Sequence, residues 1–160
     1  MSQPKLLPRE TDYGIEYLQR RLDREFPLAR HIGVRADSVD DRRVVLRAPF
    51  APNANYKGTA FGGSLYSVAV LAGWAWVTRY LAARGLAADA VIQESSVRFL
   101  SPVQGELRAR TAAPPEAQID KFRKMLQRAG RGRIRLRVEI NYGETLAALF
   151  EGVFAAAVRH

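Results

Sequence analysis

The sequence contains no cysteine and only two histidines, His31 and His160. Without cysteine the chain has no disulfide, no thiol nucleophile and no thiolate metal site, which is compatible with a reducing compartment. Two isolated histidines and scattered acids make no set of metal ligands, so neither a metal nor another cofactor is implied. The first residues, MSQPKLLPRE, lack the apolar core of an export signal. We therefore expect a cytoplasmic protein.

Acidic residues are in the minority, since 25 Lys and Arg stand against 16 Asp and Glu, a formal net charge of +9. Such a charge attracts nucleic acid, acidic lipid, phosphorylated cofactors or an acidic protein, and does not choose among them. Nucleic-acid binding would need a reading element, and the sequence has no zinc spacing, no RNP-like aromatic pair and no evident helix-turn-helix. We expect no nucleic-acid partner.

The length of 160 residues, with 48% hydrophobic and 26% charged residues, is typical of one globular domain. Residues 1–10 carry prolines and charges and are expected to form a flexible N-terminal arm before a single domain at 11–160. Apolar residues at three- and four-residue spacing predict a helix from Thr11 to Ala29, capped by Thr11 or Asp12.

Alternating patterns further along the chain predict six strands and a short helix. In the last hairpin Arg131, Arg133, Arg135 and Arg137 alternate with apolar residues, so one face of that strand should be cationic. The first four strands are expected at His31–Val39, Arg42–Ala48, Ala90–Leu100 and Glu106–Ala112, the helix at Pro114–Gly130, and the last two strands on either side of a turn at Tyr142-Gly143-Glu144.

The longest apolar stretch runs without a charge from Phe61 to Val77 and predicts a helix over Gly62–Ala83. Its length approaches that of a transmembrane span, but its glycines and hydroxyls and the lack of a second such segment argue against one. A helix that is apolar all round can instead be buried by protein. We expect an α+β fold, a curved antiparallel sheet of about six strands wrapped around this helix, with a second subunit covering the rest.

Two segments, NANYKGTAFGGSLYSVAVLAGWAW at 53–76 and ESSVRFLSPVQGEL at 94–107, resemble the hotdog-fold thioesterases, most closely the family typified by the C-terminal domain of YiiD. The likeness extends over roughly Leu28 to Val158. It implies a homodimer or tetramer with the hotdog fold, in which two sheets join edge to edge and active sites lie at the subunit interface. It also implies acyl groups in thioester linkage to coenzyme A or acyl carrier protein as substrates.

Three groups of residues near the start of the long helix are candidates for the site. Unpaired N–H groups at Gly62 and Gly63 could polarise a thioester carbonyl and stabilise the oxyanion, or the glycines could only permit tight packing. Asn55 could orient a carbonyl or a water, or form an ordinary Asx turn. The substrate-binding candidates are Asn53, Lys57, Gly62, Ser64, Ser67 and Arg98, although Ser64 and Ser67 could equally bond back to the helix backbone.

The sequence departs from the commoner members of this superfamily, which often place His-Gly-Gly where Phe61-Gly62-Gly63 stands or carry an acid nearby. No acid or histidine occurs between Pro49 and Ala88, so the usual base or nucleophile is missing. Glu94 could replace it by pointing towards the helix N-terminus or across an interface. Pointing outward, Glu94 would be a solvated residue paired with Arg98.

Two functions from different classes follow from these residues. The first is an acyl-thioester hydrolase, with Gly63 N–H as oxyanion donor, Asn55 orienting carbonyl or water, and Glu94 or an unassigned group as base. The second is an acyl-CoA or lipid-binding module without turnover, which the missing acid favours. Lys57 or Arg98 could attract the phosphates of coenzyme A or an acidic carrier protein, whereas the arginine strand is more typical of a solvated face.

Overall fold

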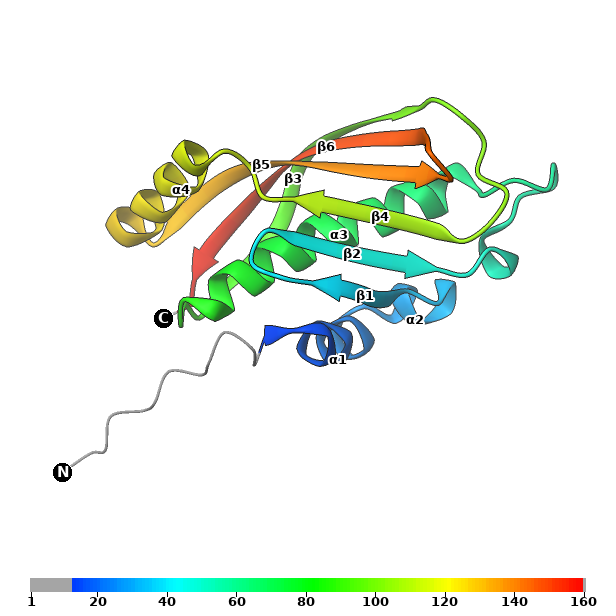
Figure 1. Ribbon diagram of the computed structural model, residues 1–160. Coiled ribbons are helices and arrows are strands. Elements are labelled where there is room, and N and C mark those ends of the chain that lie inside the picture. Colours follow the sequence, from blue (N-terminus) through cyan, green and yellow to red (C-terminus); the bar gives the residue numbers. More distant parts are fainter. Residues whose placement is uncertain (1–12, 160) are drawn as a thin grey trace.

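Figure 1 shows the computed structural model, which describes residues 13–159 as a curved six-stranded sheet wrapped around one long helix. This arrangement confirms the predicted α+β class. The expected arm at residues 1–10 and the helix cap at Thr11 or Asp12 lie outside the described residues. The helices are α1 (Ile15–Glu25), α2 (Pro27–Ile32), α3 (Gly62–Ala83) and α4 (Glu116–Ala129), with a 3-10 turn η2 at Ala51–Asn53. The strands are β1 (Arg35–Val39), β2 (Arg43–Ala48), β3 (Ala88–Phe99), β4 (Leu107–Ala112), β5 (Arg131–Tyr142) and β6 (Thr145–Val158).

The single helix predicted at the N-terminal end is wrong, because the structure has two helices there. Phe26 adopts an extended conformation (φ −126°, ψ 91°) between them, since the ring of Pro27 disfavours a helical conformation for the residue before it. Helix α2 ends at Gly33, which has the left-handed φ of 76°. His31 is therefore helical, and the strand predicted to start there begins instead at Arg35.

The strands lie in the order β1-β2-β4-β5-β6-β3, and every neighbouring pair is antiparallel. The long hairpin β5–β6 forms the middle of the sheet, and its register runs from Arg131 opposite Ala157 to Tyr142 opposite Thr145. Strands β1 and β3 are the two edges. Within residues 13–159, β3 has a strand neighbour on one side only, so its other edge is free to pair.

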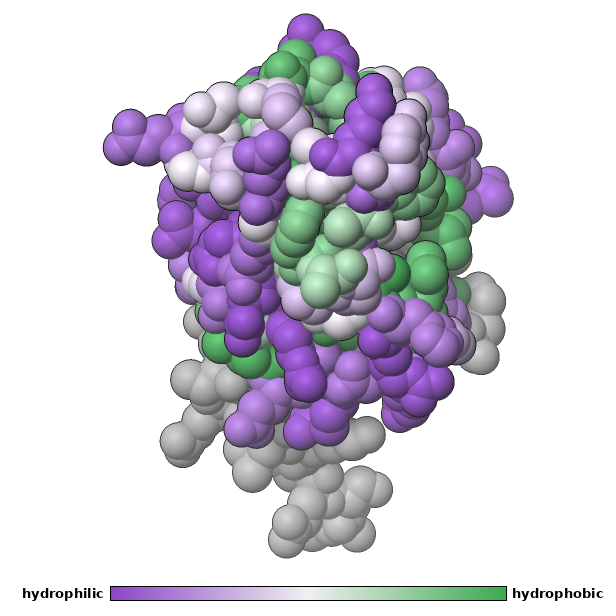
Figure 2. Space-filling view, turned by 90° about the vertical axis from the view of Figure 1, so that its right-hand side faces the viewer, coloured by the Kyte–Doolittle hydropathy of each residue, from purple (hydrophilic) through white to green (hydrophobic). Residues whose placement is uncertain are grey.

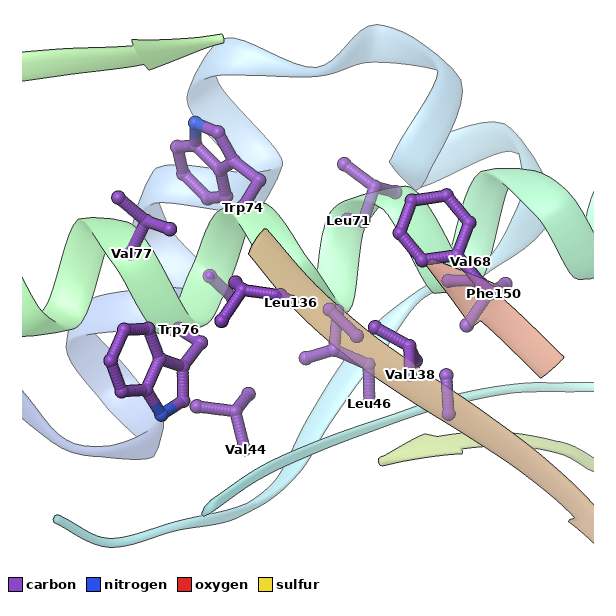
Figure 3. Close-up of a cluster of buried hydrophobic side chains, with 14 of the residues drawn as sticks. Val44, Leu46, Val68, Leu71, Trp74, Trp76, Val77, Leu136, Val138 and Phe150 are labelled. Atoms are coloured by element: carbon purple, nitrogen blue, oxygen red, sulfur yellow. The ribbon is translucent and has the colours of Figure 1, made fainter. Parts of the chain in front are cut away.

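Helix α3 has the predicted bounds, and it is apolar on nearly every face because the fold surrounds it. Side chains from β2, β5 and β6 pack against it from the sheet (Figure 3), and each of those labelled is at most 7% exposed. The Phe26 ring, between α1 and α2, contacts Trp74 edge-on at 4.7 Å. From α4, the Phe122 ring lies 5.9 Å from that of Tyr80. Burying each such side chain contributes about 1.5–3 kcal/mol to stability.

The apolar character of α3 thus serves the core of the domain. Within residues 13–159, none of the helices combines the length and apolarity needed to cross a membrane.

Candidate active site at the start of the long helix

The candidate site begins at the N-terminus of α3, where Gly62 and Gly63 are the first two helical residues. The residue before them, Phe61, is extended (φ −62°, ψ 131°), and no side chain caps the helix. First-turn N–H groups have no partner inside their own helix, and within residues 13–159 no other group accepts a hydrogen bond from these two glycines. Two donors and the positive end of the helix dipole are therefore available to an oxygen that gains negative charge.

Asn53 holds this helix start in place from within the protein. Its carbonyl accepts the Phe61 N–H at 2.7 Å, and its amide nitrogen donates to the carbonyls of Ile32 (2.8 Å) and Pro49 (2.7 Å). The residue is 1% exposed, so it acts on the site as a support. Its predicted contact with substrate stays a prediction. Among residues 13–159 the buried side-chain oxygen of Asn53 has no hydrogen-bond partner.

The side chain of Asn55 closes the loop that precedes α3. Its amide nitrogen donates to the Thr59 hydroxyl at 2.8 Å, and its oxygen accepts the N–H groups of Lys57 (2.9 Å) and Thr59 (3.2 Å). This is the Asx-turn arrangement, and it leaves one amide hydrogen for a ligand. The orienting role of Asn55 stays a prediction. Lys57 is exposed in this loop, with its ammonium 5.8 Å from the centre of the Tyr56 ring.

A hollow of about 330 Å³ opens beside the glycine pair. Phe61, next to the hollow, and Phe99 and Leu100 in its lining are 57%, 55% and 50% exposed. Figure 2 views the molecule from the side on which α3 begins, and apolar residues gather there between polar ones. Contiguous exposed apolar surface of this kind marks a binding or interaction site. The lining residues are Ala60, Gly62, Leu65, Phe99, Leu100, Ser101, Pro102 and Val103.

Two aromatic rings restrict the space around the glycines. A side chain at position 62 would meet Phe99 at an ordinary 3.5 Å, whereas one at position 63 would overlap the ring of Phe61. A side chain at position 63 would therefore require the exposed ring of Phe61 to move aside.

The two serines of the first helical turns are used differently. The Ser67 hydroxyl donates to the Gly63 carbonyl at 2.8 Å, which is the bond back to the helix that the sequence left open. Ser64 is 8% exposed, and its N–H donates to the Phe61 carbonyl at 2.9 Å. In this state both serines support the helix start, and their contact with substrate stays a prediction.

A β-bulge in β3 decides which of its side chains face α3. The register pairs Ile92 with Phe154 and Glu94 with Val153, so Gln93 is an extra residue. The alternation of side chains therefore changes phase at this point. The half-buried residues, on the α3 side of the strand, are Ala88, Ala90, Ile92, Ser95 and Val97.

The phase change moves Glu94 to the outer face of the sheet. Glu94 and Arg98 are both exposed there, and within residues 13–159 no ion pair joins them. Within one chain the sheet separates Glu94 from Gly63, so its predicted action as a base would need a second subunit. The roles of Glu94 and Arg98 stay predictions.

The same phase change places Ser95 against α3. The Tyr66 hydroxyl lies 2.6 Å from the Ser95 hydroxyl, and either can be the donor. The Tyr66 ring also packs edge-on against Phe150 at 5.8 Å. Tyr66 stands three residues after Gly63, about one helical turn. Helical spacing alone could have placed Tyr66 on the side of the glycines, but no sequence pattern reveals the bulge that brings Ser95 to it.

The predicted cationic face of β5 is confirmed, since its exposed arginines alternate with buried residues. Some arginines on the outer face are paired: Arg110 and Arg137 contact Glu139 at 3.0 and 3.4 Å. The hydrogen bond that Arg108 on β4 donates to the Asp37 carboxylate raises the pKa of Arg108. This face lies across the sheet from the glycine pair, so the arginines do not line the hollow.

The comparisons with known proteins agree with this architecture. The family model described as "Putative thioesterase (yiiD_Cterm)" matches residues 15–158. Among solved structures, the chain is similar to a protein of unknown function from Chlorobaculum tepidum TLS, with 29% identity, a TM-score of 0.87, and coverage of 96% of this chain and 98% of that one.

Two further structures show the fold at lower identity. A "putative thioesterase" from Shewanella oneidensis has 24% identity and a TM-score of 0.82, covering 93% of this chain and 99% of that one. A thioesterase from Haemophilus influenzae has 16% identity and a TM-score of 0.63, with 90% of each chain covered. Because the family model spans almost all the described residues, the chain belongs to the family described as "Putative thioesterase (yiiD_Cterm)", and its fold is the hotdog fold.

Proposed function

We propose that this protein hydrolyses acyl thioesters of coenzyme A or acyl carrier protein in the cytoplasm, at the start of α3. The observation that carries the proposal is the pair of unpartnered N–H groups at Gly62 and Gly63 beside an apolar hollow. When water attacks the thioester, the carbonyl oxygen gains negative charge, which the Gly63 N–H would stabilise. One such donor is typically worth a factor of ~10²–10³ in rate. The exposed rings of Phe61 and Phe99 offer apolar surface for the acyl chain.

A second copy of the chain would complete each site. The free edge of β3 and its exposed Val91 (61%) and Phe99 (55%) support pairing of two subunits along this strand. Such a contact would also cover the open side of the hollow. Lys57 in the preceding loop, or Arg98 on β3, would then attract the phosphates of coenzyme A or an acidic carrier protein.

The direct test is release of free thiol from a panel of short, medium and long acyl-CoAs, followed with a thiol-reactive dye. The protein has no cysteine of its own to react with the dye. Two variants distinguish the loss of the Gly63 N–H from the effect of adding a side chain at that position. Gly63→Pro removes the N–H at a position in the first helical turn, where proline is tolerated. Gly63→Ala also places a side chain against the Phe61 ring, but it keeps the N–H.

We expect Gly63→Pro to lower kcat about 10²-fold further than Gly63→Ala, with both variants folded by circular dichroism. Equal activities in the two variants would remove Gly63 N–H as the oxyanion donor. Analytical ultracentrifugation tests the second subunit: we expect twice the mass of the chain, and a monomer with full activity would contradict a shared site.

A second candidate function is an acyl-CoA-binding module without turnover. The observation in its favour is that no Asp, Glu or His from residues 13–159 lines the hollow. Isothermal titration with the same acyl-CoAs separates the two functions, because a binding module would bind them and release no thiol.

A further inference from the structure

We propose that the hydroxyl pair Tyr66–Ser95 positions the attacking water and passes its proton to the departing thiolate, in place of a carboxylate base. This inference rests on the proposed thioesterase function and names the groups that would make it work without an acid. It starts from the 2.6 Å contact between the Tyr66 and Ser95 hydroxyls. This is the hydroxyl–hydroxyl hydrogen bond that joins α3 to β3 in the described chain.

The location of the pair fits a role in the site. Tyr66 follows Gly63 by three residues, so its Cα lies only ~4.5 Å further along the helix axis. Strand β3 runs beside the same turns, since its Phe99 lies against Gly62 and its Ser95 against Tyr66.

The two hydroxyls are also open to a ligand. Both Tyr66 and Ser95 are only half-buried, and a bonded pair of hydroxyls keeps one hydrogen and further lone pairs for other partners. Burial alone does not explain the contact, because Tyr80 and Thr111 have fully enclosed hydroxyls without a hydrogen-bond partner within residues 13–159. A pair that solvent can reach, one helical turn beyond two unpartnered N–H donors, suits the binding of one water.

The proposed step balances without an external base. The water oxygen forms a bond to the thioester carbonyl carbon, and the carbonyl π electrons move to the oxygen beside the Gly63 N–H. As the tetrahedral intermediate collapses, the carbon–sulfur bond breaks and its electron pair stays on sulfur. One hydroxyl of the pair accepts the proton that the water loses and passes its own proton along their hydrogen bond to the other hydroxyl, which gives its proton to sulfur. The electron pair on the oxyanion re-forms the carbonyl as the carbon–sulfur bond breaks. The products are a carboxylic acid and a thiol, and both hydroxyls end as they began.

The described residues that line the hollow include no group that could act as the usual base, so another proton acceptor is needed. Within residues 13–159 no carboxylate or imidazole lines the hollow, and the bulge at Gln93 turns Glu94 to the outer face and Ser95 to α3. The residue that the fold brings to this helix is therefore the serine.

The test uses Tyr66→Phe, Ser95→Ala and their combination in the thiol-release assay, with Ser96→Ala as the matched control on the opposite face of the same strand. We expect each single variant to lower kcat about 10²-fold with KM within about twofold. The double variant should be no slower than the slower single variant, since the two hydroxyls act as a unit. Ser95→Thr restores a hydroxyl and should recover most of the activity, and Ser96→Ala should match the unmodified protein.

The outcomes separate this inference from the function on which it rests. Full activity in Tyr66→Phe or Ser95→Ala would overturn the relay and leave the thioesterase proposal intact. Loss of activity in Ser95→Thr as well as in Ser95→Ala, with circular dichroism spectra unchanged, would overturn it too, because the hydroxyl would then be irrelevant. No thiol release by the unmodified protein on any acyl-CoA, with binding retained, would overturn both proposals.

Discussion

Replacing Gly73 with alanine should destabilise the protein, although alanine is the better helix former. A Cβ at this position would lie 2.5 and 2.7 Å from two ring carbons of Phe154, whereas carbon atoms in contact are ~3.5–4.0 Å apart. The ring or the helix must therefore move by about 1 Å. Phe154 is 1% exposed and packs against Phe150, so it has little space to move into.

The sign of the change in stability shows whether helix propensity or overpacking of the core is the larger contribution. Alanine in a helix interior gains about 1 kcal/mol over glycine, and overpacking a core costs about 1–3 kcal/mol. We expect the Gly73→Ala variant to lose up to about 2 kcal/mol in free energy of unfolding, which corresponds to a Tm lower by up to about 8 °C for a domain of this size. Urea unfolding followed by circular dichroism measures the free energy, and a thermal scan measures the Tm.

A double-mutant cycle with Phe154→Leu tests the cause. The smaller leucine makes room for the new methyl group, so the double variant should be more stable than the sum of the single changes predicts, by about 0.5–3 kcal/mol. A Gly73→Ala variant that is more stable by about 1 kcal/mol would refute the packing argument, because helix propensity would then act unopposed.

Three further predictions concern support of the fold. Asn53→Ala should lower the free energy of unfolding by about 1–3 kcal/mol in urea titrations, because two loop carbonyls lose their donor, and it should lower thiol release as the start of α3 loosens. Asp41→Asn should cost about 1–3 kcal/mol, since Arg79, with a side chain only 10% exposed, loses its charged partner at 3.0 Å; a stability equal to the unmodified protein would contradict this. Burial alone would raise the pKa of Glu25, but the hydrogen bonds that it accepts, first from Arg21, outweigh burial and hold this pKa below the usual value. The contribution of Glu25 to stability is therefore present above about pH 4.3 and is lost as the pH falls through the folded pKa. Glu25→Gln should therefore reduce stability at pH 7 and converge with the unmodified protein in acid; a difference independent of pH would refute the linkage.

Local patterns were sufficient for much of the architecture. The bounds of α3 follow from an apolar stretch opened by two glycines, and the strand β5 follows from arginines that alternate with apolar residues. The first is a long uninterrupted apolar stretch and the second a two-residue alternation, and tertiary contacts reinforce both. The helix predicted over Thr11–Ala29 failed at Pro27, whose effect on the preceding residue competes with the apolar spacing.

The sequence by itself determined that a long apolar helix begins with two bare glycines and that no acid or histidine accompanies it between Pro49 and Ala88. Only the tertiary structure decided which side chains of the sheet contact that helix. One extra residue in β3 reverses the face of the sheet on which each later side chain of the strand lies, so that Glu94 points away from α3 and Ser95 contacts Tyr66. A bulge is set by how a strand pairs with its neighbour, and that register depends on β6, where Val153, opposite Glu94, lies about sixty residues further along the chain.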